Sequence, residues 1–172
     1  MSKSNVEVFE PKTHHLFISS FSVGSIGDVI KNPNERINDL LEFCNVDFLG
    51  VAYVDEGVEL RKNGIAKPIL VMNPSVGSFN TLINHRLTPA IHDLNQLNSF
   101  TGKLIDLNVN AYPVHLKLNS GMNRLGFSEN EIDFLITFLK SQPEIKVEGI
   151  FSHLFASDNK KGESQTLDQI QN

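Results

Sequence analysis

Short apolar runs alternate with amphipathic stretches along the chain from about residue 30 onward. A continuous apolar run of five to ten residues predicts a strand that is covered on both faces. VDFLGVAYV (46–54) and KPILVMN (67–73) are such runs, and LTPAIHD (87–93) is a short strand or extended segment limited by Pro89. PVHLKLN (113–119) alternates apolar and polar residues, and KVEGIFSHLF (146–155) is a further predicted strand. These segments recur roughly every 20 to 35 residues, which is typical of strands joined by helices in a parallel sheet.

Helix signals fill the stretches between these runs. NPNERINDLLEFC (32–44) opens with a cap and a proline at the first helical position, and its apolar residues then share one face. Asp55 is expected to cap a short helix that Gly64 ends. Ser128 and Glu131 have capping-box spacing and predict a helix of about three turns after them. Further helices are predicted in SVGSFNTLINH (75–85), LNQLNSF (94–100) and ESQTLDQIQN (163–172).

The alternation predicts an α/β fold, an incomplete (β/α)₈ TIM-type barrel with five to six βα units. A complete barrel takes about 250 residues, and this sequence has 172. No dinucleotide-binding glycine pattern is found, which disfavours a Rossmann domain. We expect a divergent N-terminal segment over 1–30 and a partial barrel domain over 31–172. An unclosed barrel exposes apolar strand edges, so a homodimer or other self-association through those edges is expected.

Composition and charge narrow the class of protein. Hydrophobic residues make up 40% of the chain and charged residues 20%, as in ordinary globular domains. The net charge of −5 offers no basic face, so no nucleic-acid partner is expected. The single cysteine, Cys44, excludes a disulfide framework and predicts a cytoplasmic protein in which Cys44 fills the core. No apolar run approaches the ~18 residues of a membrane span, and no signal peptide is found.

Polar residues that end the predicted strands are the candidates for chemistry, because parallel barrels form their active sites there. Asp55, Glu56 and Asn73 follow two of the strands, and the stretches 117–124 and 153–158 follow two others. Gly121 permits a tight turn after Lys117, and Arg124 in that turn either clamps an anionic oxygen or pairs with a nearby acid.

His153 allows two readings as well. It lies at the end of an apolar strand, where it is either a hydrogen-bonded core residue or part of a site. Asp158 is most simply a turn residue or helix cap.

Three stretches together resemble the alanine racemase family. VHLKLNSGMNRLGF is similar to the family's H-x-K-x-D-T-G-M-x-R-L-G, and VEGIFSHLFASD to its G-hydrophobic-hydrophobic-T-H-F-A-x-A-D. VAYVDEGVELRKNGIAKPILVMNP resembles its VA-x-x-DEA-x-x-LR-x-x-GI-x-x-PILVL. The resemblance covers about 36–172 and is closest in style to the racemase half of bacterial ligase–racemase fusions. It implies a barrel of PLP fold type III that binds pyridoxal 5′-phosphate (PLP) and interconverts L- and D-alanine for peptidoglycan synthesis.

The resemblance also implies roles for five residues. Arg124 matches the arginine that hydrogen-bonds the PLP phenolic oxygen, and Lys117 matches a lysine, often carbamylated, that orients this arginine. His153 matches the histidine that stacks on the pyridine ring. Met72 falls where the family has a pocket leucine, and Met122 at the loop methionine.

The family's Schiff-base lysine, in V-K-A-x-A-Y-G, has no clear counterpart. One alignment places Ser19 at this lysine, and another keeps Lys31 but loses the tyrosine and glycine that follow; loss of the lysine is favoured. The family's phosphate-binding loops and second catalytic tyrosine match nothing up to Asn172, and Asn119 and Ser120 replace an aspartate and a threonine. An incomplete or inactive racemase is therefore expected. The alternative is a non-catalytic barrel that binds a ligand or partner chain.

Overall fold

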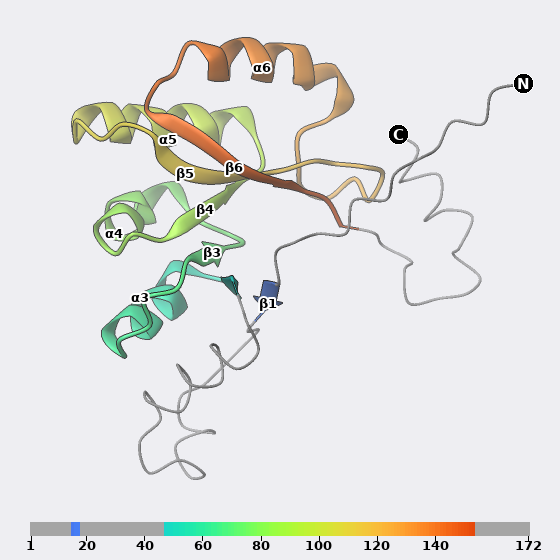
Figure 1. Ribbon diagram of the computed structural model, residues 1–172. Coiled ribbons are helices and arrows are strands. Elements are labelled where there is room, and N and C mark those ends of the chain that lie inside the picture. Colours follow the sequence, from blue (N-terminus) through green and yellow to red (C-terminus); the bar gives the residue numbers. More distant parts are fainter. Residues whose placement is uncertain (1–14, 18–46, 154–172) are drawn as a thin grey trace, which may run out of the picture.

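The computed structural model describes the backbone of residues 15–17 and all atoms of residues 47–153 (Figure 1). The strands are β1 (His15–Phe17), β2 (Phe48–Val51), β3 (Ile69–Val71), β4 (Thr88–Ile91), β5 (Tyr112–Lys117) and β6 (Ile145–Phe151). The helices are α3 (Val54–Lys62), α4 (Phe79–Asn84), α5 (Leu94–Asp106) and α6 (Ile132–Lys140), with short 3₁₀ turns η1 (Val76–Ser78) and η2 (Glu129–Glu131).

The six strands form one parallel sheet whose spatial order is the order of the chain. Within the described residues β1 and β6 pair only on one side each, so the sheet is open between them. This arrangement confirms the predicted incomplete α/β barrel. All strands run in the same direction, so their C-terminal ends share one edge of the sheet, where the candidate residues of β5 and β6 lie.

The two faces of the sheet have different neighbours. Leu49, Val51, Ile69, Val71, Ile91, Val114 and Leu116 belong to one apolar cluster with residues of the helices, among them Leu82, Phe100 and Leu135. The alternate positions, such as Leu70, Ala90 and Lys117, are also buried but lie outside this cluster. Side chains alternate along a strand, so these positions line the concave inner face, away from the helices (Figure 1).

The start of α3 differs from its prediction. The helix begins at Val54, so Asp55 lies inside its first turn and is not the cap. The Glu56 carboxylate instead accepts the backbone N–H groups of Ala52 and Tyr53, at 2.7 and 3.1 Å. The apolar run 46–54 hid this boundary because Val54 is buried on the helix just as Val51 is on the strand. Gly64, with φ of 83°, follows the helix as predicted.

Other boundaries agree or extend the expectation. The capping box of Ser128 and Glu131 is confirmed ahead of α6. α5 continues to Asp106, beyond the predicted stretch, because Thr101 and Leu104 extend its buried face. β6 ends at Phe151, before the predicted end of that run. The predicted helices 32–44 and 163–172, with Cys44, lie outside the described residues.

Several large apolar side chains are exposed near the edge formed by β6. Ile150 is 63% exposed, and Phe134 and Ile136 on α6 are 55% and 45% exposed. The predicted exposure of apolar surface is thus present, while self-association stays a prediction. In the described part of the chain no helix is long and apolar enough to cross a bilayer.

Candidate functional site

A tight turn after β5 carries Arg124, and Lys117 is the last residue of the strand before it. The Asn119 side chain organises this turn: its Oδ1 accepts the backbone N–H groups of Gly121 and Asn123, at 3.2 and 2.9 Å. Its Nδ2 donates to Asn123 Oδ1 at 2.9 Å. An aspartate here keeps the first two bonds and loses the third, so asparagine adds one bond to the turn. Asn123 itself has φ of 54°, a conformation that asparagine tolerates.

The base of the turn is closed by backbone bonds. Phe127 N–H donates to Lys117 O and Asn119 N–H donates to Phe127 O, both at 2.9 Å. This closure needs glycine at position 126, which has φ of 127°. A Cβ at Gly126 would lie 2.6 Å from the backbone nitrogen of Asn119. The segment from Lys117 to Phe127 is thus a closed loop with Arg124 in its exposed part.

The end of β6 is tied to this loop through two serines. Ser152 Oγ donates to Leu118 O at 2.9 Å and lies 2.6 Å from Ser120 Oγ. His153 follows directly and is exposed. The ends of β5 and β6 are therefore joined by side chains just beyond the last backbone bond, from Leu118 N–H to Phe151 O.

Two positive groups meet at this loop. Lys117 is only 7% exposed, on the inner face of β5. Burial, together with the nearby Arg124 guanidinium, lowers the pKa of Lys117. Among the described residues neither Lys117 nor Arg124 forms an ion pair. The site therefore holds positive charge that no described carboxylate compensates.

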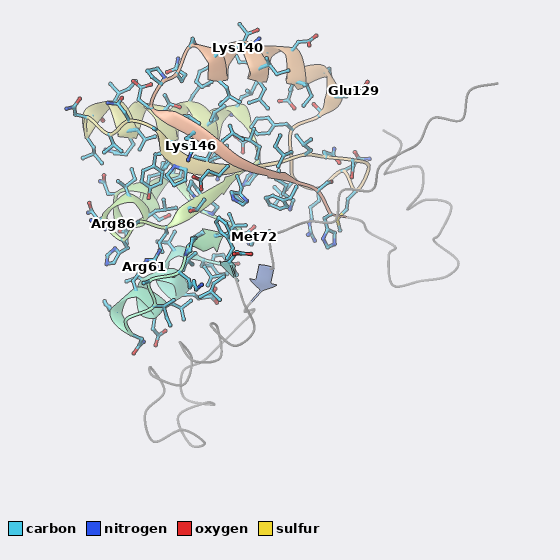
Figure 2. The ribbon with its side chains drawn as sticks, viewed as in Figure 1. Arg61, Met72, Arg86, Glu129, Lys140 and Lys146 are labelled. Atoms are coloured by element: carbon cyan, nitrogen blue, oxygen red, sulfur yellow. The ribbon has the colours of Figure 1, made fainter. Side chains whose placement is uncertain are left out.

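Four of the five predicted cofactor residues line a single pocket. Its space, including the opening to solvent, is about 200 Å³. The lining residues are Lys117, Leu118, Asn119, Ser120, Met122, Arg124, Leu125, Ser152 and His153. Met72 is half-buried beyond the end of β3 and does not line it (Figure 2). The Schiff-base candidates Lys31 and Ser19, and Asp158, lie outside the described residues. The roles of all these residues stay predictions.

Sequence reasoning missed His115, which lies two residues before Lys117 and on the same face of β5. It is 6% exposed, and its ring contacts the ring of Phe48 with centroids 5.2 Å apart. A β-bulge places Gly149 opposite His115, and a Cβ at Gly149 would lie 2.7 Å from the imidazole. The two-residue spacing from Lys117 was the available signal. Ser152 was missed as well, and no local pattern marks it.

A second pocket lies at the opposite ends of the strands and includes Arg61 and Arg86 (Figure 2). Arg61 donates to the carbonyl oxygens of Ile65, Lys67, His85 and Arg86, at 2.6 to 3.0 Å. These bonds use four of the five N–H groups of the guanidinium. Arg61 therefore fastens the loops around α3 and α4, which is a structural role.

Comparisons with known proteins agree with the observed architecture. Residues 36–172 match the family model "Alanine racemase, N-terminal domain". The alanine racemase of Sorangium cellulosum is 34% identical over 122 residues, covering 69% of this chain and 32% of the relative. Alanine racemase 1 of Oceanobacillus iheyensis is 34% identical over 131 residues, covering 74% of this chain and 34% of the relative. The solved structure of the alanine racemase of Clostridium difficile 630 superposes with a TM-score of 0.75 at 30% sequence identity. The match covers 94% of this chain and 41% of that one. The chain thus spans about a third of the length of these curated relatives.

Proposed function

The chain belongs to the alanine racemase family through its N-terminal barrel domain, and from this premise we propose that the ends of β5 and β6 bind the ring of PLP. The observation that carries the proposal is the grouping of Lys117, Arg124 and His153 around one pocket at neighbouring strand ends. By family membership, the reaction that belongs to such a site is the interconversion of L- and D-alanine, and the partial barrel domain that carries the site corresponds to residues 31–172.

The residues present fit the ring end of this cofactor. Arg124 offers paired donors to an anionic oxygen, and no described carboxylate competes for them. The imidazole of His153 offers a flat face for stacking, and Met122 an adaptable apolar contact. When bound, PLP supplies an electron sink that acidifies the α-hydrogen of an amino acid.

Lys117 adjusts the charge of this pocket. Its lowered pKa increases the fraction of the amine that is neutral at a given pH. Part of this lowering comes from the charge of Arg124, so the two groups are close enough to repel each other. An anionic oxygen bound between them would relieve this repulsion, and in this way Lys117 would orient Arg124 toward it.

We also propose that residues 1–172 do not racemise alanine alone, because the family's lysine motif is not found in this sequence. The amine required to bond PLP is then either Lys31 or missing. Self-association through the exposed apolar surface around Ile150 and Phe134 completes the proposal. Light scattering tests it, and a monodisperse monomer contradicts it.

A PLP titration followed by absorbance and fluorescence tests the cofactor proposal. We expect saturable binding that Arg124→Met weakens about tenfold, the loss of roughly 1.4 kcal/mol. Arg86→Met is the matched control, since Arg86 is an exposed arginine at the opposite ends of the strands (Figure 2).

Borohydride treatment and peptide mapping then test for a covalent bond to Lys31, and chiral chromatography tests for D-alanine. Binding without label or D-alanine supports an inactive descendant. Label on Lys31 with D-alanine formation overturns the proposed inactivity. No saturable binding, or equal loss in both arginine variants, refutes the ring site.

A further inference from the structure

The hydroxyl groups of Ser120 and Ser152 form a hydrogen-bonded chain whose direction is fixed. Ser152 Oγ donates to the carbonyl oxygen of Leu118, and a serine hydroxyl has one proton to give. The 2.6 Å contact between Ser152 Oγ and Ser120 Oγ must then use the proton of Ser120. The order is therefore Ser120 to Ser152 to the end of β5.

The hydrogen bonds of these two serines take the place of the next backbone hydrogen bond between β5 and β6. The last backbone bond between β5 and β6 runs from Leu118 N–H to Phe151 O, at 2.8 Å. One residue later the Ser152 side chain, instead of a backbone group, donates to Leu118 O. His153 follows Ser152, and the closed loop that carries Arg124 follows Leu118. The two serines are thus the described side-chain link between the two halves of the candidate site.

We propose that Ser120 and Ser152 are positioning residues that hold the Arg124 loop and His153 in one fixed relation for binding a flat anionic ring. This inference rests on the proposed PLP function. Asn119 shapes the loop through bonds to Gly121 and Asn123, and Gly126 through its backbone conformation, so within the described residues both act inside the loop. Ser152 is exposed and Ser120 half-buried, so water can replace the lost bonds when either is removed. The serines therefore affect ring binding more than folding.

Measurements of PLP affinity in variants that lack a serine hydroxyl test the role of these hydrogen bonds. Ser120→Ala, Ser152→Ala and the double variant are titrated with PLP. Each single variant should bind about five- to tenfold more weakly, and the double variant no more weakly than the weaker single one, because both remove one link. Ser152→Thr keeps the hydroxyl and should bind within about twofold of the parent.

Ser141→Ala is the control, since Ser141 Oγ donates to Phe138 O at 2.7 Å at the end of α6. It should leave the affinity unchanged, and melting temperatures of all variants should agree within about 2 °C. The inference is overturned if the losses of the two single variants add up in the double variant. It is also overturned if Ser120→Ala and Ser152→Ala bind PLP as tightly as Ser141→Ala does.

A readout without PLP separates this inference from the proposed function. The ring ¹H–¹³C signals of His153 are recorded by NMR in the cofactor-free protein. Ser120→Ala should move them, although Ser120 lies 33 residues earlier on the other strand end, and Ser141→Ala should not. Unmoved His153 signals in Ser120→Ala overturn the positioning role. If the parent protein does not bind PLP, the proposed function is overturned. The NMR result then still decides whether Ser120 and Ser152 position His153 relative to the Arg124 loop.

Discussion

Replacing Lys117 by methionine should make the protein more stable, although Lys117 is central to the candidate site. The lysine side chain is 7% exposed and faces Arg124 without an ion-pair partner among the described residues. Methionine fills a similar volume and needs no hydration. Replacing a buried ion pair by well-packed apolar residues is often neutral or stabilises a protein by about 1–4 kcal/mol, and Lys117 has no described ion-pair partner to lose.

We expect the lower end of this range, because the Lys117 side chain also lines the pocket, where its amine can be partly hydrated. An increase of about 1 kcal/mol corresponds to a melting temperature roughly 2–4 °C higher for a chain of this length.

The pH dependence gives the prediction a second arm. The folded-state pKa of Lys117 is lowered from its ordinary value of 10.5. The unfolded state therefore binds more protons between the two pKa values, so the stability of the parent protein rises with pH across that window. The advantage of Lys117→Met is full below the folded-state pKa and shrinks as the pH approaches 10.5.

Thermal and urea unfolding at pH 7 and pH 10 measure both arms. Lys140→Met is the control because Lys140 is exposed at the end of α6 (Figure 2), and it should change the stability by less than about 0.5 kcal/mol. A lower melting temperature for Lys117→Met at pH 7, or an advantage that grows with pH, would refute the reasoning.

Three further substitutions test the fold. Gly126→Ala should cost about 2–3 kcal/mol in urea unfolding, because the left-handed backbone and the 2.6 Å approach to Asn119 N leave no room for a Cβ; an unchanged midpoint contradicts this. Ser128→Ala should cost about 1 kcal/mol at neutral pH. Hydrogen bonds from Ser128 lower the pKa of Glu131, so this stabilisation should disappear as the pH falls through that lowered pKa, and a loss independent of pH argues against the capping box. Phe100→Ala should cost about 3–5 kcal/mol by calorimetry, since Phe100 is fully buried between Phe79 and Tyr112 with ring centroids 4.9 and 5.5 Å away; a cost below 1 kcal/mol contradicts this core.

The loop after β5 was predictable because its determinants are local. Lys117 ends an alternating strand, glycines mark the turn, and Arg124 follows within seven residues. The capping box before α6 is local in the same way. Such features depend on backbone conformation within one turn, which short-range residue chemistry decides.

The remaining features depend on contacts between distant segments. Ser152 meets Ser120 only because β6 pairs with β5, and Gly149 faces His115 only because a bulge shifts that pairing. The apolar periodicity of one strand does not specify which residues of a neighbouring strand lie opposite it. A one-residue shift in this register turns every side chain of the strand to the opposite face. The periodicity also misplaced the end of β2, because Val51 of the strand and Val54 of the helix are both buried and only three positions apart.

The strand order that repeats the chain order has a consequence for how the protein forms. Paired residues in neighbouring strands are only 18 to 34 positions apart, from Val71 with Pro89 to Lys117 with Phe151. Each pairing therefore closes a loop of moderate length, and the entropic cost of closure grows only slowly with loop length. The sheet can grow by one βα unit at a time at its β6 side during synthesis, so the Arg124 loop has its supporting strands in place before His153 arrives.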